Sequence, residues 1–234
     1  MTKRIFHLVF FAVPLSFIFG QSPVRKFDSS QYDSEFYLQF APKKKFPKEI
    51  ASQVLTALSF YPELSNVKII FRIKKRKTPL TSRPRILSVF RRKKNRCYVI
   101  TISSETTEQL SPILFDRLPY NAQIGVLGHE LGHITEYNSK NTFQILGLSF
   151  SILNSKFVDK FEWNTDKIAI EHGLGYQLLD WSSYVRNTLN ILEWKGATKD
   201  LANGNELQVN QRYMNPITII RYIKERSIYK PLLD

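Results

Sequence analysis

The residues best suited to chemistry in this chain of 234 residues stand together in the run His129-Glu-Leu-Gly-His133. Residues four positions apart on a helix lie on one face, so the imidazoles of His129 and His133 can bind a single zinc ion. Glu130 is offset from that face and can reach past the metal to a water molecule, from which it would take a proton. The spacing therefore predicts one Zn2+ per chain and metal-assisted hydrolysis, with Glu130 as the catalytic base.

A catalytic zinc site of this kind needs a third protein ligand. The metzincin pattern is excluded because its glycine and histidine positions hold Glu136 and Ser139, and Cys97 lacks the surroundings of a deformylase-like site. Glu162 and Asp166 lie four residues apart in a stretch with helical periodicity, and so share one face. Glu162 can complete a set of two histidines and one glutamate. Asp166 can accept a hydrogen bond from the free ring nitrogen of a ligand histidine.

Two motifs of the chain, His129–His133 and Glu162-Trp-Asn-Thr-Asp-Lys167, together resemble those of the gluzincin metallopeptidases. The chain is most similar to the branch that contains the prenyl-protein endopeptidases and the bacterial stress-induced membrane proteases. In that branch the third ligand is the first residue of a Glu-x-x-x-Asp motif, which is followed by a basic residue and an alanine. Lys167 and Ala169 match these two positions. The resemblance covers about residues 120–175 and implies a zinc metalloendopeptidase with the ligand set given above. The chain departs from the branch in lacking the long transmembrane helices of many members.

The resemblance does not identify the group that stabilises the transition state. Four side chains downstream of the motifs are candidate donors to a tetrahedral oxyanion, namely Tyr176, Tyr184, Arg212 and Tyr213. The sequence does not choose among them. His172 instead suits the carboxyl-terminal end of a helix, because Gly173 follows it.

The helix that must carry His129 and His133 has an unusual composition. Asn121 can cap it, and an apolar face is formed by Ile124, Leu127, Leu131 and Ile134. Gly125, Gly128 and Gly132 each cost about 1 kcal/mol relative to alanine inside a helix. We therefore expect another backbone or a substrate to approach this helix closely.

The elements around this helix predict an α+β fold. A helix follows Pro47 and ends before Pro62, and three strands are predicted at Val67–Ile73, Arg85–Phe90 and Cys97–Ser103. These strands would form a small antiparallel sheet with the N-terminal helix across one face, and the strand before the active helix would bind an extended peptide at its edge. Helical periods then cover about 121–138, 142–153, 156–172, 176–194 and 216–226, which predicts a mainly helical, zincin-like half. Asn215-Pro216 supplies the cap of the last helix.

The N-terminal segment has the pattern of an export signal. Lys3 and Arg4 precede an apolar run, Ile5–Gly20, that is shorter than the roughly 20 residues a spanning helix needs. We expect residues 1–20 to be a signal peptide or N-terminal anchor, with a buried helix as the alternative. Residues 21–45 are predicted to be a basic linker and residues 46–234 the metallopeptidase domain. The protein is then exported, and is periplasmic, secreted or anchored to the membrane.

Composition narrows the classes of partner. A hydrophobic fraction of 43% excludes wholesale disorder, and the single cysteine excludes an intramolecular disulfide or a multi-cysteine zinc site. The net charge of +14 predicts an anionic neighbour, such as a membrane or envelope surface. No nucleic-acid partner is expected, because no binding motif accompanies the basic clusters Lys74–Lys77 and Arg91–Arg96, which also suit solvated turns. The apolar run 143–153 is either a core helix or an interfacial segment.

Two functions from different classes fit these features. The first is a zinc metalloendopeptidase that acts on a peptide or protein substrate. The alternative is a catalytically silent, zinc-containing binding module at an anionic cell-envelope surface. The basic clusters favour the binding module, whereas Glu130 favours the enzyme, because a structural zinc site has no use for a base at that position.

Overall fold

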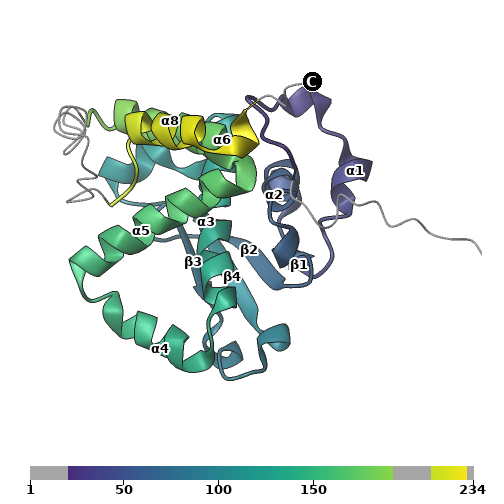
Figure 1. Ribbon diagram of the computed structural model, residues 1–234, viewed down its shortest axis with the longest axis vertical. Helices are drawn as coiled ribbons and strands as arrows, with labels where there is room; N and C mark the ends of the chain where they lie inside the picture. Colours follow the sequence, from purple (N-terminus) through teal and green to yellow (C-terminus); the bar gives the residue numbers. More distant parts are fainter. Residues whose placement is uncertain (1–20, 192–211, 231–234) are drawn as a thin grey trace, which may run out of the picture.

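The structure is a computed structural model that describes residues 21–191 and 212–230. The predicted signal or anchor segment, residues 1–20, lies outside the described residues. The helix predicted over 176–194 ends earlier than expected, at Thr188, and residues 192–194 of that prediction also lie outside the described ranges. The fold is α+β, with a small sheet packed against a set of helices (Figure 1). No helix in the described ranges combines the length and apolarity needed to cross a bilayer.

The sheet is mixed rather than antiparallel. Its described strands are β1 (Lys44–Lys45), β2 (Lys68–Lys74), β3 (Leu80–Pro84) and β4 (Cys97–Ser103), in the order β1-β2-β4-β3. β2 pairs in parallel with β1 and β4, and only β3 and β4 are antiparallel. The predicted antiparallel sheet is therefore wrong. The apolar β4 is buried at the centre, whereas the polar, proline-ended β3 suits an edge.

The strand predicted at Arg85–Phe90 is also wrong. This segment holds a short 3-10 turn, Ile86–Ser88, and the strand that pairs with β4 comes before it. The Ser88 hydroxyl donates to the carbonyl oxygen of Arg85 at 2.7 Å and accepts from the backbone nitrogen of Cys97 at 3.1 Å. These bonds hold a turn, and the apolar side chains of the segment do not enter the sheet.

The helices follow the predicted periods closely. They are α1 (Ser34–Leu38), α2 (Ala51–Leu58), α3 (Tyr120–Ser139), α4 (Thr142–Ser151), α5 (Ser155–Ala169), α6 (Gly175–Thr188) and α8 (Pro216–Glu225). Asn215 caps α8 as predicted, by accepting a hydrogen bond from the backbone nitrogen of Thr218 at 2.8 Å. A π-helical turn, Ile170–Leu174, joins α5 to α6, and Gly173 in it has a φ of 97°. His172 thus stands at a helix end before a left-handed glycine, as expected.

Residues 21–45 pack on the domain and do not form a linker. Besides α1 and β1, they include Phe27, whose ring lies 5.9 Å from that of Phe60 in the core. The Asn121 side chain accepts from the Phe27 nitrogen and donates to its carbonyl oxygen, both at 2.8 Å. Asn121 therefore does not cap α3, which begins after Pro119. Its amide is instead used to fasten the N-terminal segment to that helix.

The glycines of α3 allow close packing by the helices that follow. A Cβ on Gly125 would collide with the backbone carbonyl of Gln177 in α6, and one on Gly128 would meet Leu174. At Gly132 the nearest atoms belong to Thr165 in α5, 3.1 Å from where a Cβ would be. The expected close approach of another backbone is confirmed. It places α5 and α6 directly over the stretch of α3 that holds His129 and His133.

Candidate metal centre

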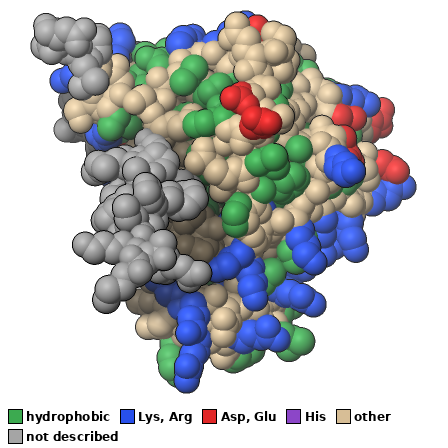
Figure 2. Space-filling view, turned by 90° about the vertical axis from the view of Figure 1, so that its right-hand side faces the viewer, with side chains coloured by type: hydrophobic (Ala, Val, Ile, Leu, Met, Phe, Trp, Pro, Cys, Tyr) green, Lys and Arg blue, Asp and Glu red, His purple; other side chains and the backbone are tan. Residues whose placement is uncertain are grey.

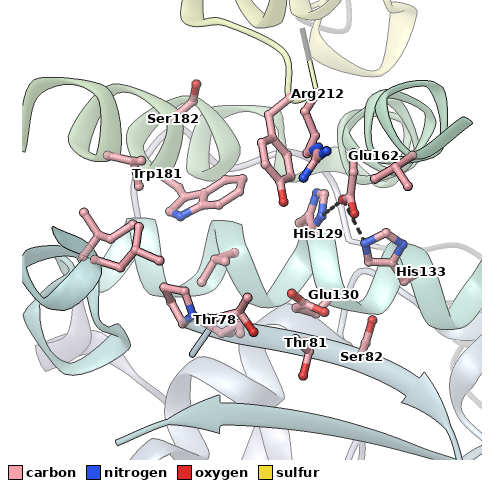
Figure 3. A pocket seen from close by; sticks show the side chains of 18 of the residues that line it. Thr78, Thr81, Ser82, His129, Glu130, His133, Glu162, Trp181, Ser182 and Arg212 are labelled. Atoms are coloured by element: carbon pink, nitrogen blue, oxygen red, sulfur yellow. Dashed lines mark hydrogen bonds and ion pairs between the residues drawn. The ribbon is translucent and has the colours of Figure 1, made fainter. Parts of the chain in front are cut away.

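Three candidate ligands from two helices converge on one point. His129 and His133 are one turn apart on α3, and Glu162 reaches them from α5 (Figure 3). Its Oε2 lies 3.0 Å from Nε2 of His129 and 3.1 Å from Nε2 of His133. The three ligand atoms all lie within 4.8 Å of one another, so a metal ion between them would have one imidazole nitrogen from each histidine and one carboxylate oxygen.

The remaining ring nitrogen of each histidine has its own partner. Nδ1 of His129 lies 2.8 Å from Oδ1 of Asp166, and the other oxygen of Asp166 accepts from the Met214 nitrogen at 2.7 Å. Nδ1 of His133 lies 3.0 Å from Oγ1 of Thr165, which donates its own proton to the carbonyl oxygen of Phe161. Both Nδ1 atoms therefore act as donors, so each histidine, once Nε2 has lost its proton, can offer the Nε2 lone pair to a metal ion beside Glu162.

The electrostatics of this cluster favour positive charge. Burial disfavours the charged form of His129, but hydrogen bonds and charges from Asp166 and Glu162 outweigh burial and raise its pKa to about 10. Burial also opposes charge on Glu162, yet the two histidines hold the pKa of this carboxyl well below its usual range. Buried carboxylates around paired imidazoles fit a divalent cation, which brings positive charge to the same point. The donor set of two nitrogens and one oxygen suits zinc.

Glu130 lies beside the three converging atoms without being one of them. Its side chain is 5% exposed, and its Oε2 has no hydrogen-bond partner within residues 21–191 and 212–230. Figure 3 places it between the histidines of α3 and the Thr81 and Ser82 side chains of β3. A buried carboxylate without a partner is unfavourable unless a bound molecule or ion supplies one. Its position suits a base that acts on a molecule held in front of it.

A cavity of about 620 Å³ opens in front of the candidate ligands. Glu130, His129, His133 and Glu162 form one wall, and apolar side chains of α3, α5 and α6, among them Val126, Phe161 and Trp181, form another part of the lining. Strand β3 supplies a further wall through Leu80, Thr81 and Ser82. The site is thus a mainly apolar cavity with a few convergent polar groups, as small-molecule and peptide sites usually are.

The edge strand that borders the cavity is not the predicted one. The strand that precedes the active helix is β4, which is paired on both sides and has no free edge. β3 has its edge open, because within the described residues it pairs with β4 alone. The Arg85 nitrogen donates to the carbonyl oxygen of Cys97, and the Ser103 nitrogen donates to that of Pro79. The odd-numbered residues of this stretch therefore direct their backbone groups toward β4. Leu80 and Ser82 consequently turn their backbone groups toward the free edge.

Two of the four candidate oxyanion donors lie at the cavity. Tyr213 lines it with its ring 5.6 Å from that of His129, and Arg212 lines it while its Nε lies 3.1 Å from Asp159. Burial, together with the charges of Glu162 and Glu130, raises the pKa of Tyr213 well above its usual value, so the hydroxyl keeps its proton. The structure therefore leaves Tyr213 as a hydrogen-bond donor beside the ligands.

The other two candidates do not line the cavity. Tyr184 donates to the carbonyl oxygen of Arg117 at 2.9 Å, and Tyr176 packs edge-on against Tyr229 under the guanidinium of Arg25. The structure therefore does not bring either hydroxyl to the candidate ligands, as the prediction required. Both lie on α6, whose cavity-facing positions are held by other residues.

Two side chains that contact the histidines were not among the predicted site residues. Trp181 on α6 lines the cavity with its ring 5.5 Å from that of His129. No local pattern marks it, because α6 meets α3 through long-range packing. Thr165 could have been predicted from the sequence, because it lies three residues after Glu162 and therefore on the same side of the helix.

His172 does not line the cavity. Its ring stacks on that of Tyr61 at 4.3 Å, and its Nε2 lies 3.1 Å from a carboxylate oxygen of Glu63.

Comparisons of the chain with protein-family models, with curated proteins and with solved structures gave no match. The gluzincin resemblance accordingly stays a prediction drawn from two motifs.

Proposed function

We propose that this protein is a zinc-dependent metalloendopeptidase. The observation that carries the proposal is the convergence of His129, His133 and Glu162 with a buried, unpartnered Glu130 beside them. A structural metal site has no need for a carboxylate held without a partner at the edge of a cavity. A hydrolytic site does need one, because a general base must be free to accept a proton.

The residues of the chain divide the work of peptide hydrolysis as follows. Zinc, when bound, supplies the Lewis acidity that polarises a carbonyl and lowers the pKa of water. Glu130 accepts the proton of the attacking water on its free carboxylate oxygen and delivers that proton to the leaving amine. Asp166 and Thr165 hold His129 and His133 in the tautomer and orientation that ligands need. The protonated Tyr213 hydroxyl donates to the developing oxyanion.

The cavity and β3 suit an extended peptide. An extended segment that pairs with the free edge of β3 would pass between Glu130 and the edge strand. The apolar walls, including Trp181, lower the polarity of the surroundings, which strengthens the electrostatic interactions of the site. A peptide or protein substrate is therefore proposed, with main-chain pairing as the means of orientation.

The test is the variant Glu130→Gln. The amide keeps the shape of the side chain but cannot accept a proton, so zinc content and melting temperature are expected to match the wild type. Loss of a general base lowers rates by about 10²–10⁴. Cleavage of a broad peptide library is measured for both proteins, with a chelator as a second control. Equal rates in the two proteins contradict the mechanism, and zinc-loaded wild type that cleaves nothing favours the silent binding module.

A further inference from the structure

The most exposed large apolar side chains of the described residues are confined to two segments. Six of these side chains are between 67% and 87% exposed: Ile86, Leu87, Phe90, Phe143, Phe150 and Leu153. The next most exposed is Leu38, at 58%. All six lie in the turn 86–90 or in α4 and the residues that follow it. Such concentration on a surface marks an interaction site, since single exposed apolar residues are normally scattered.

The two segments form one continuous face although about 50 residues separate them. The Thr142 hydroxyl donates to the carbonyl oxygen of Val89 at 3.0 Å. Arg96, which is 4% exposed, donates to the carbonyl oxygen of Lys140 at 2.6 Å and to the Thr142 hydroxyl at 3.1 Å. The turn before β4 and the start of α4 are thereby fixed together, at the end of the molecule farthest from α8 (Figure 1).

Helix α4 turns an apolar stripe outward. Its inner contact is Ile145, which is buried. Phe143 and Phe150, seven residues apart, lie along the opposite face, and Leu153 is exposed in the turn that follows α4. Packing within the described residues does not account for this outer stripe. At 10 residues, α4 is too short to span a bilayer but long enough to lie in its interface.

The charges around these side chains have a single sign. Segments 83–96 and 140–156 contain nine Lys and Arg residues and no Asp or Glu. Lys140 pairs with Glu136, and Arg96 is the buried bridge, whereas Arg91, Arg92, Lys93 and Lys94 are exposed. On the face drawn in Figure 2, Lys and Arg side chains with hydrophobic ones among them cover the lower end, where no acidic side chain is visible, and the visible Asp and Glu side chains lie higher, among further Lys and Arg side chains. This combination is complementary to an anionic surface with an apolar layer beneath it.

We propose that this basic–apolar face, formed by residues 86–94 and by Phe143, Phe150 and Leu153, docks on a bilayer that contains anionic phospholipid. The four exposed bases of residues 91–94 contact phosphate headgroups, while the apolar side chains enter the boundary between headgroups and acyl chains. Ile152 is half-exposed beside this face and also lines the cavity. Docking would therefore bring the mouth of the cavity to the lipid surface. The proposal does not depend on peptidase activity.

The first test locates the contact on the full-length chain. Phe150→Trp and Ile217→Trp each place an indole at an exposed apolar position, on α4 and on α8 at the opposite end. Vesicles of phosphatidylcholine with about a third phosphatidylglycerol carry brominated acyl chains, which quench tryptophan only within the bilayer. We expect additional quenching for Phe150→Trp and none for Ile217→Trp, relative to wild type. Residues 1–20 are the same in both variants. Equal quenching at the two positions, or none at 150 while the chain is bound to vesicles, overturns the proposal.

The second test separates this face from overall charge. Replacing Arg91, Arg92, Lys93 and Lys94 by glutamine removes four bases from the face. The matched control replaces Lys74, Lys75, Arg76 and Lys77, four bases at the opposite end of β2 and β4. Each base near an anionic surface contributes about five-fold to partitioning, so the first variant is expected to bind anionic vesicles more than 100-fold less and neutral vesicles equally well. An equal loss of binding to anionic vesicles in the control variant overturns the proposal. It is also overturned if the wild type forms dimers in sedimentation through this face and does not bind vesicles.

Discussion

Each candidate histidine ligand is held by a different kind of group. His129 donates to a buried carboxylate that a backbone amide also holds, whereas His133 donates to the hydroxyl of Thr165. A carboxylate makes its imidazole more basic and adds charge, while a hydroxyl fixes orientation without charge. The two ligands therefore differ in how strongly their surroundings favour metal binding, and this difference can be measured.

Glu162→Ala is expected to lower zinc occupancy as severely as His133→Ala, because each removes one of three ligand atoms. Asp166→Ala leaves the ligands in place, so we expect a smaller loss, of about 10–100-fold in affinity. Glu171→Ala, which removes an exposed carboxylate five residues beyond Asp166, serves as the control. Metal analysis and competition with a chromogenic chelator measure all four. Full zinc in Glu162→Ala would show that the ligand assignment is wrong.

Thr165→Val keeps the branched shape of the side chain but removes the acceptor for Nδ1 of His133. The imidazole can then adopt the other tautomer, which turns a protonated Nε2 toward the metal position. We expect zinc affinity to fall by about ten-fold or more, and Thr165→Ser, which keeps the hydroxyl, to bind zinc nearly as wild type does. Calorimetric titration of the metal-free proteins measures this difference. Identical affinities for the valine and serine variants would contradict the assigned hydrogen bond.

At this scale the sequence predicts what is local and misses what is not. His129, His133, Glu162 and Asp166 follow from spacing within two helices, and the structure brings their side chains together. Trp181 and the choice of Tyr213 over Tyr176 depend on where α6 and the residues before α8 pack. That packing is decided by contacts between distant segments, so no spacing rule identifies these residues.

Among the elements, the helices and the strands β2 and β4 were predictable, whereas the strand pairing and the edge strand β3 were not. A helix has a period that three or four turns make plain, as in the stretch that became α3. β3 is a short polar edge strand with almost no pattern, whereas the apolar residues Ile86 and Leu87 imitate a strand although their side chains face outward. The wrongly predicted strand at Arg85–Phe90 and the exposed apolar turn there thus have one cause. Residues that suit a buried strand are used here on the surface.

The contact between α3 and α6 gives a prediction at the element scale. Alanine normally stabilises a helix relative to glycine by about 1 kcal/mol. At Gly125 the added methyl group would meet the Gln177 backbone, so Gly125→Ala is expected to destabilise the protein by about 1–3 kcal/mol. Gly147→Ala in α4 is the matched control, because nothing lies within 4 Å of its new Cβ. Urea denaturation should show opposite signs for the two. Stabilisation by both would mean that α6 does not approach α3 so closely.

At the scale of the whole molecule, the candidate ligands lie where two apolar clusters meet. The larger cluster joins the sheet, α2 and α3, and the smaller joins α5, α6 and α8. Glu162 comes from α5, whose Phe161 packs in the larger cluster and whose Trp163 packs in the smaller. A metal that is bound by α3 and α5 together therefore connects both clusters, and unfolding of either would release it.

Zinc is thus expected to stabilise the whole fold rather than one loop. A ligand that binds only the folded state at about 1,000 times its Kd adds about 4 kcal/mol to the free energy of unfolding. For a chain of this size that corresponds to a rise in Tm of roughly 10 °C. Scanning calorimetry with zinc and with a chelator should show one shifted transition in the wild type and in Glu130→Gln, which keeps all three ligands. Glu162→Ala should show almost no shift. A rise in Tm with zinc that persists in Glu162→Ala would place the stabilising metal elsewhere. If the transition splits and zinc shifts only one part of it, the two clusters unfold independently.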